Sequence, residues 1–153
     1  MTHQSGLVDE VDELQRLVAA NTDRFAPVAT IDHSRLAGEA GMEMPPCIVT
    51  IFSDPTSNAP LIATNPLIGL DLPHRVLAYA EPGATEASLA FGDAGYLERR
   101  HGVADAELLS RYEWVLEEAL SGTSADIRRP VALDQIDVDF GIHNLVSEHP
   151  FEE

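Results

Sequence analysis

The spacing of apolar residues predicts two amphipathic helices. The first has one apolar stripe, with acidic residues filling the gaps, which indicates a helix over residues 7–18. The residues of this stripe are Leu7, Val11, Leu14 and Val18. A second stripe follows Asp105, a residue type that caps helices, and stops at Gly122. It predicts the longest helix of the chain, over residues 105–121.

Runs of apolar and β-branched residues predict strands. Cys47–Pro55 is apolar on both faces, so we expect a central strand that is covered on both sides. Two further runs flank the Pro-Gly pair of residues 82–85, a hairpin signal. The predicted strands before the long helix cover residues 25–34, 47–55, 74–80 and 86–91. The chain therefore mixes α and β elements, and it shows no internal repeat.

The last part of the chain predicts a polar linker and one more strand. Residues 121–130 are mostly polar. After them Val138, Phe140 and Ile142 alternate with polar or small residues, which is typical of a half-buried strand, here placed over residues 137–147. The length fits one domain over residues 1–153.

The charge balance is strongly acidic. The chain has 26 Asp and Glu against nine basic residues, all of them Arg, for a net charge of -17. This balance disfavours nucleic acid and anionic membranes as partners, because phosphate binding depends on Lys and Arg. A GC-rich gene or a halophilic surface would each explain the missing lysine, and the excess of carboxylates favours the halophilic surface.

Other composition features exclude several classes of protein. The single cysteine, Cys47, cannot form an internal disulfide, and it leads a predicted buried strand, where such a thiol is inert. The six histidines show no metal-ligand spacing, so we expect neither metal nor cofactor. No apolar run is long enough to span a membrane, and the acidic start is unlike a signal peptide. The sequence predicts a cytoplasmic protein.

From Val28 to Val103 the sequence resembles the bacterial and archaeal family called domain of unknown function 302. The matching segments are IDHS at 31–34, IVTIFSDP at 48–55, APLIATNPLIGLDLP at 59–73, RVLAY at 75–79 and GDAGYLERRHGV at 92–103. The resemblance implies an α+β fold like that of the TATA-box-binding protein, in which a curved antiparallel sheet has helices packed on one face. That fold carries no function by itself.

The order of elements differs from the family pattern. Family members usually begin with a strand and a short segment that leads into the first helix, whereas this chain starts with the helix. Gly141–Glu153 resembles the missing piece, so we interpret the chain as circularly permuted, with the C-terminal strand replacing the usual first strand. Two alternatives stay open: an unrelated edge strand, or a strand donated to a second subunit.

Four polar residues are candidates for ligand binding: Asp32, His33, Asn65 and Asp71. Asp32 and His33 follow a predicted strand, and a carboxylate beside a histidine can form an acid–base pair. Alternatively, Asp32 or Ser34 caps the next helix and His33 lies on the surface. Asn65 and Asp71 lie in the NPLIGLDLP stretch, where their oxygens could instead accept hydrogen bonds from turn backbone.

Two classes of function therefore remain. The first is a binding module for a small molecule or a protein partner, including a second copy of the chain as a homodimer. The second is a small enzyme that uses Asp32 and His33 as its acid–base pair. Convergence of the four candidate side chains on one pocket would favour the enzyme.

Overall fold

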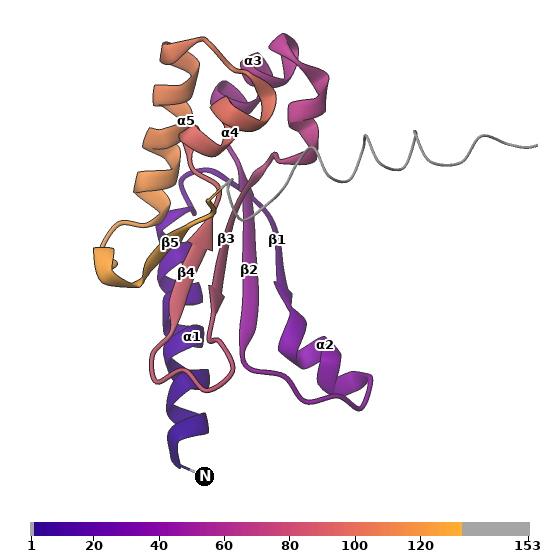
Figure 1. The fold of residues 1–153 in the computed structure, drawn as a ribbon, viewed down its shortest axis with the longest axis vertical. Helices are drawn as coiled ribbons and strands as arrows, with labels where there is room; N and C mark the ends of the chain where they lie inside the picture. The colour runs from indigo at the N-terminus through magenta and orange to yellow at the C-terminus, as the bar shows by residue number, and fades with distance from the viewer. Residues whose placement is uncertain (1, 133–153) are drawn as a thin grey trace, which may run out of the picture.

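The computed structural model describes residues 2–132. Within this range the chain forms one five-stranded sheet, and its helices lie at the two ends of the sheet and along one side of it (Figure 1). The α-helices are α1 (Thr2–Asn21), α2 (His33–Glu39), α3 (Pro55–Thr64), α4 (Ala94–His101) and α5 (Ala106–Ala119). Two short 3-10 helices are η1 (Pro66–Leu70) and η2 (Ala125–Ile127). The strands are β1 (Ala26–Asp32), β2 (Cys47–Ser53), β3 (His74–Tyr79), β4 (Ser88–Phe91) and β5 (Arg128–Pro130).

The five strands lie in sequence order, β1-β2-β3-β4-β5. The first three pairs are antiparallel, as expected, and β3 and β4 form the hairpin that the Pro-Gly pair predicts. The fourth pair, β4 with β5, is parallel. The predicted α+β class is therefore confirmed, with a sheet that is mixed rather than purely antiparallel.

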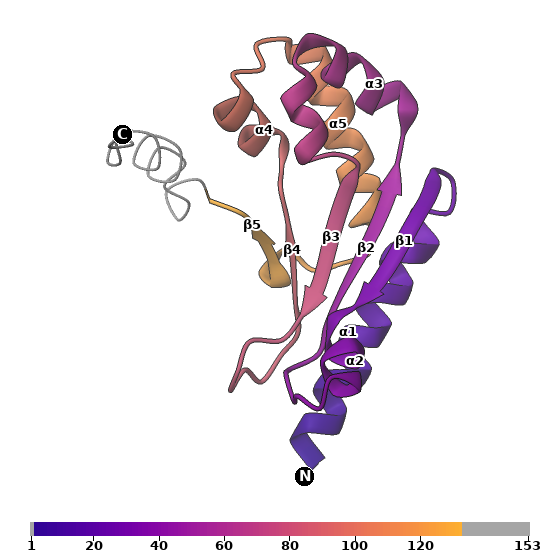
Figure 2. The same cartoon turned by 90° about the vertical axis from the view of Figure 1, so that its right-hand side faces the viewer.

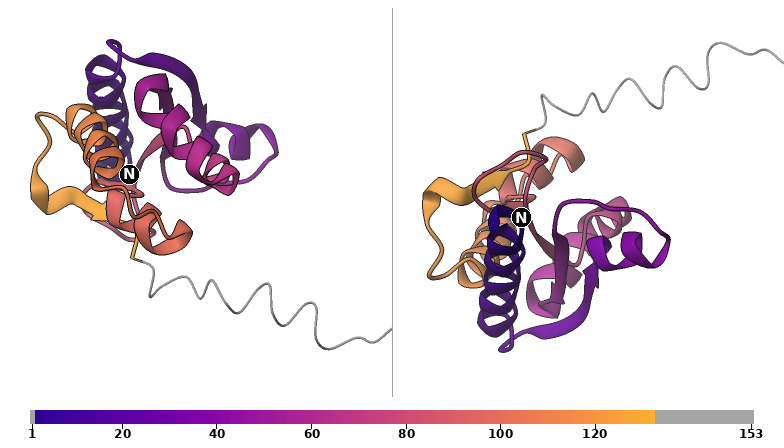
Figure 3. Two further views of the ribbon diagram at one scale, coloured as in Figure 1. Left: turned by 90° about the horizontal axis from the view of Figure 1, so that it is seen from above. Right: turned by 90° about the horizontal axis from the view of Figure 1, so that it is seen from below.

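Helix α1 packs on one face of the sheet against β2 and β3, and α5 lies beyond it towards the end that carries α3 and α4 (Figure 1 and Figure 3). Because successive strand residues point to opposite faces, alternate residues of β2 and β3 are buried against these helices. The strands contribute Phe52, Val76 and Leu89 to this core, and the helices contribute Val11, Val18, Val115 and Leu116. The apolar stripes of the two helices thus meet the inner face of the sheet.

The opposite face of the sheet is not covered by a helix of residues 2–132 (Figure 2). Its half-buried side chains include Val49, Ile51, Leu77 and Tyr79. The strand register also places Arg75 and Arg129 on this face, and no carboxylate of the described strands. The prediction that β2 is covered on both sides is therefore wrong for the described residues. The reason is that an apolar pattern on two faces does not say what covers the second one. We call this surface the open face.

The helix caps follow the sequence closely. The carboxylates of Asp93 and Asp105 accept hydrogen bonds from the first turns of α4 and α5, and Gly102 ends α4 in the left-handed conformation, with φ of 67°. The prediction that the helix after Asp105 is the longest is wrong, since α1 has 20 residues and α5 has 14. Polar residues before Leu7 extend α1 without lengthening its apolar stripe.

The segment predicted as a linker, residues 121–130, contains η2 and the strand β5. Side-chain contacts that the sequence pattern does not reveal hold it in place. The guanidinium of Arg128 donates hydrogen bonds to the hydroxyl of Thr123 and to the carbonyl of Leu120. The predicted permuted strand over residues 137–147 lies outside the described residues.

Candidate functional site

Asp32 and His33 do not form an acid–base pair in the structure. The Oδ1 of Asp32 accepts hydrogen bonds from the backbone N–H of Arg35, at 2.8 Å, and from the hydroxyl of Ser34, at 2.7 Å. Partial burial opposes ionisation of this carboxyl, but the hydrogen bonds outweigh it and lower its pKa. His33 is the exposed first residue of α2. Asp32 is therefore a helix cap.

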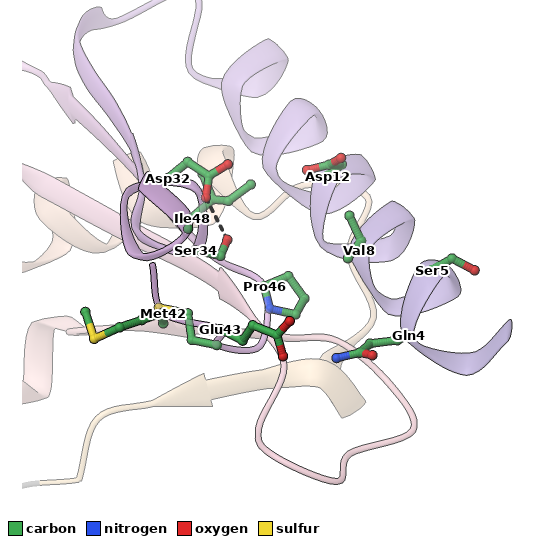
Figure 4. A pocket seen from close by; sticks show the side chains of 12 residues that line it. Gln4, Ser5, Val8, Asp12, Asp32, Ser34, Met42, Glu43, Pro46 and Ile48 are labelled. Atoms are coloured by element: carbon green, nitrogen blue, oxygen red, sulfur yellow. Dashed lines mark hydrogen bonds between the residues drawn. The ribbon is translucent and has the colours of Figure 1, made fainter. Parts of the chain in front are cut away.

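Asp32 also lines a groove of about 530 Å³ between α1 and the loop after α2 (Figure 4). Val8, Met42 and Pro46 form apolar walls, while Asp12 and Glu43 add two further carboxylates. Cys47 comes directly after the lining residue Pro46 in the chain. Burial, together with the charge of Asp32, raises the pKa of its thiol. The thiol stays protonated near neutral pH, as expected for an inert cysteine. No basic side chain of the described residues lines the groove.

Asn65 is a turn residue. Its Oδ1 accepts a hydrogen bond from the backbone N–H of Leu67 at 3.1 Å, which caps η1. The following residue is Pro66, which suits the first position of a helix because it needs no hydrogen-bond acceptor. Asn65 thus forms the turn hydrogen bond that the sequence offers as the alternative to ligand binding.

Asp71 behaves differently, because its side chain leaves its own turn and meets α4. Its Oδ2 lies 2.5 Å from the Nε2 of His101 and 2.9 Å from the Nε of Arg100. The side chains are 18%, 6% and 28% exposed for Asp71, His101 and Arg100, so the cluster is largely shielded from water. Two basic groups thus fix one carboxylate oxygen, while the Oδ1 accepts no hydrogen bond from the described residues.

Asp71 lines a cavity of about 240 Å³ at the end of the sheet where β3 begins and β4 ends. The cavity lies between Asp71 and Arg75, and the rings of Tyr96 and Tyr112 contribute to its wall. Its backbone wall includes Gly92, where an added Cβ would lie 3.2 Å from the Tyr96 ring. We call this cavity the Asp71 pocket. Glycine at this position keeps the ring close to the chain.

The hydroxyls of the two tyrosines both form hydrogen bonds within the described residues, Tyr112 as a donor and Tyr96 as an acceptor. The hydroxyl of Tyr112 donates to the carbonyl of Gly92 at 2.7 Å, and burial raises the pKa of this phenol, which keeps it protonated. The hydroxyl of Tyr96 accepts a hydrogen bond from Arg100 at 3.1 Å. Arg75, by contrast, is exposed and forms no ion pair with the described residues. The guanidinium of Arg75 and the O–H of Tyr96 are the donors among the lining side chains for which the described residues provide no acceptor.

A buried histidine supports the pocket from the core side. The ring of His74 stacks between Phe52 and Tyr112, at centroid distances of 5.3 and 4.2 Å. His74 is fully buried, and this burial lowers its pKa to about 4. Its Nδ1 has no hydrogen-bond partner among the described residues. The imidazole is therefore neutral near pH 7, and it acts as an aromatic packing residue.

The four candidate residues do not converge. Asp32 pairs with Ile48 at one end of β2, whereas Asp71 comes just before His74, which pairs with Phe52 at the other end. The residues at or behind the Asp71 pocket that sequence reasoning missed come from two elements: Arg75 from β3, and Arg100 and His101 from α4. The only sequence signal for them is the run of basic residues at the end of the α4 segment.

Neither a metal centre nor a membrane span is evident in residues 2–132. Within this range no group of three or more His, Cys, Asp or Glu side chains is placed to hold a metal ion. No helix of the same range combines the length and the apolar character needed to cross a bilayer.

Comparisons with known proteins give a family and a fold. A family model described as Domain of unknown function DUF302 matches residues 2–119. Curated relatives from Brucella suis, Brucella abortus and Brucella melitensis, named fluoride-specific ion channels FluC 1 or FluC 2, are each 38% identical over 108 residues. The match covers 65% of this chain but only 39% to 41% of the relatives' length.

A solved structure supports the fold. It is a crystal structure of an uncharacterized conserved DUF302 protein from Bacillus stearothermophilus, with a TM-score of 0.59 and 18% sequence identity. The likeness covers 72% of this chain and 88% of that chain. At this identity, the similarity shows a shared fold and no more.

Proposed function

The chain belongs to the family described as domain of unknown function DUF302, and that name assigns no activity. From the site itself we propose that the protein is a module that binds a small molecule in the Asp71 pocket. One observation carries the proposal. Asp71 faces a cavity while Arg100 and His101 fix its orientation from behind. Binding sites commonly hold a polar group in this way, so that it needs no reorganisation when a ligand arrives.

The alternative of an enzyme with Asp32 and His33 as its acid–base pair loses support. The Oδ1 of Asp32 caps α2, and His33, the first residue of that helix, is exposed. The imidazole that does contact a carboxylate is His101, but it lies behind Asp71 and does not line the cavity. A general base must reach the proton that it removes, and His101 has no such access.

The curated relatives suggest one ligand to test. They are named as fluoride-specific channels, and this chain corresponds to about two-fifths of their length. We propose that the matching part of those proteins is a module separate from the part that spans the membrane. Fluoride is then a reasonable probe for the pocket, because Arg75 offers donors to an anion.

A ligand screen on the full chain tests the proposed function. Amide resonances of the ¹⁵N-labelled protein would be followed while sodium fluoride, sodium chloride, acetate, phosphate, imidazole and small neutral alcohols are added at constant ionic strength. We expect at least one compound to shift the amides of Gly92 and Asp93 saturably. Arg75→Gln should abolish the shift and Arg16→Gln, an exposed arginine on α1, should leave it. Binding that survives Arg75→Gln would contradict the proposal.

Other features of the sequence remain proposals of ours. We propose that the fold is of the TATA-box-binding-protein-like type without binding nucleic acid, since the chain carries a charge of -17. We also propose that residues 137–147 supply a permuted strand. The edges of the described sheet are β1 and β5, so the strand would join one of them, in the same chain or in a homodimer.

A further inference from the structure

Building on the proposed function of the Asp71 pocket, we infer that its ligand is a small carboxylate with a hydroxyl or amino group on the neighbouring carbon. The inference rests on which polar groups of the pocket are already satisfied and which are not. It also rests on the charge and the size of the cavity.

The guanidinium of Arg75 can bind the carboxylate of a ligand. Of the side chains that line it, only Asp71 and Arg75 are charged, and Asp71 is already paired with Arg100. Nearby carboxylates of Asp93 and Glu113 accept hydrogen bonds from backbone N–H groups of α4. The charge of Arg75 is therefore the one that no described side chain compensates. Arg75 thus supplies a positive charge beside the carboxylates of Asp71, Asp93 and Glu113.

The geometry of the unused groups selects the kind of anion. A guanidinium presents its donors in a fork that matches a carboxylate with two parallel hydrogen bonds. On the other side of the cavity, Asp71 has its Oδ2 occupied by His101 and Arg100 and its Oδ1 unoccupied. An ionised carboxylate only accepts hydrogen bonds, so a donor on the ligand can take the place of water at Oδ1. A hydroxyl or an ammonium next to the ligand carboxylate supplies it.

The size of the pocket limits the ligand. A cavity of about 240 Å³ is below the roughly 300–1,000 Å³ of sites for drug-sized molecules. The aromatic rings of Tyr96 and Tyr112 leave space for a short apolar side chain beside the polar groups. Compounds of the size of lactate or alanine fit these limits.

A matched ligand series tests the inference on the full chain. Lactate and alanine carry both groups, propionate has the carboxylate alone, and propane-1,2-diol has hydroxyls without a carboxylate. Titration calorimetry gives the affinities, and the amide shifts of Gly92 and Asp93 report the place of binding. We expect lactate or alanine to bind about tenfold more tightly than propionate, the value of one lost hydrogen bond, and the diol not to bind.

Variants identify the two halves of the site. Arg75→Gln should abolish binding of the whole series, and Arg16→Gln should have no effect, because Arg16 lies on α1 outside the pocket. Asp71→Asn should remove the preference for lactate over propionate and leave propionate binding unchanged. If circular dichroism shows that Asp71→Asn is unfolded, the affinities of the parent chain for lactate, alanine and propionate still test whether the hydroxyl or amino group contributes to binding.

The outcomes separate this inference from the proposed function. If propionate binds as tightly as lactate and alanine, the assignment of the hydroxyl or amino group is wrong. If only compounds of another class, such as fluoride or imidazole, shift the pocket amides, the ligand class is wrong while the proposed function holds. If no compound of either screen shifts them, both are overturned.

Discussion

The Nε2 of His101 lies 2.5 Å from the Oδ2 of Asp71, a residue 30 positions earlier in the chain. The contact joins the end of η1 to the last turn of α4. A basic residue in the last turn of a helix is favourably placed against the helix dipole, and Arg100 adds a second one. The pair therefore ties two element ends together at the wall of the Asp71 pocket.

Removing the charge of Asp71 should destabilise the protein. Asp71→Asn leaves the mostly buried Arg100 and His101 without their carboxylate, so we expect the free energy of unfolding to fall by about 1–3 kcal/mol. Denaturant unfolding measures it. The matched control is Glu39→Gln, whose partner Arg35 is on the surface, and which should cost less than about 0.5 kcal/mol. Equal effects of the two changes would contradict a structural role for the cluster.

The buried His74 should make the fold sensitive to mild acid. Its pKa is about 4 in the folded protein, against an ordinary value of 6.5. Between these values the unfolded chain binds a proton that the folded chain does not, so stability falls as the pH drops from 6.5 to 4. At about 1.4 kcal/mol per pH unit, the loss amounts to about 3 kcal/mol. Above pH 6.5 this residue contributes no pH dependence.

His74→Phe is the variant that isolates this effect. Phenylalanine keeps an aromatic ring between Phe52 and Tyr112 but cannot titrate; it also loses the contact of the His74 Nε2 with the carbonyl of Tyr112, which changes stability equally at every pH where the imidazole is neutral. Denaturant unfolding of parent and variant at several pH values between 4 and 7 gives the difference. We expect a flatter profile for His74→Phe. Parallel profiles would mean that carboxylates elsewhere determine the acid sensitivity.

The acidic surface should make the stability depend on salt. If the 26 carboxylates form a halophilic surface, the melting temperature should rise steeply from low salt to about 1 M, where the Debye length is about 3 Å. Replacing the exposed carboxylates Asp9, Glu13 and Glu43 by their amides should reduce that slope. Thermal unfolding monitored by circular dichroism measures both. A flat response of the parent chain would leave codon bias as the explanation for the missing lysine.

Residues 133–153 should be required for a stable fold if they supply the permuted strand. A chain truncated after Ala132 keeps β5 but loses Val138, Phe140 and Ile142. At ~25 cal/mol per Å² of apolar surface, three such side chains contribute several kcal/mol. We expect the truncated chain to lose cooperative unfolding in a calorimeter. Cooperative unfolding with unchanged stability would exclude the permutation.

Local features of the fold could be predicted because each depends on a few neighbouring residues. Asp93 and Asp105 cap the helices that follow them, and Gly102 ends α4, since capping needs only a side-chain oxygen or a left-handed residue at the right position. The strand β5 could not be predicted in this way. Side-chain hydrogen bonds from Arg128 to Leu120 and Thr123 hold it, and its three residues show no apolar alternation.

The candidate site was predicted only in part for a similar reason. Asp71 was named from the sequence, but its partner residues depend on where η1 and α4 meet in space. Asp32 shows the reverse case: the pattern of an aspartate next to a histidine fits both a cap and an acid–base pair, and the backbone geometry after β1 decides for the cap. A pattern of residue types cannot separate such alternatives, because both need the same carboxylate.

The open face gives dissolved salt a second effect on this protein. At low ionic strength, mutual repulsion of carboxylates keeps molecules apart even though Val49, Ile51 and Leu77 face outward. Concentrated salt screens that repulsion, and salts that strengthen the hydrophobic effect increase the gain from covering the same side chains. Ionic strength thus affects the association of molecules as well as the stability of the fold. The salt in a crystallisation trial or a storage buffer changes both properties at once.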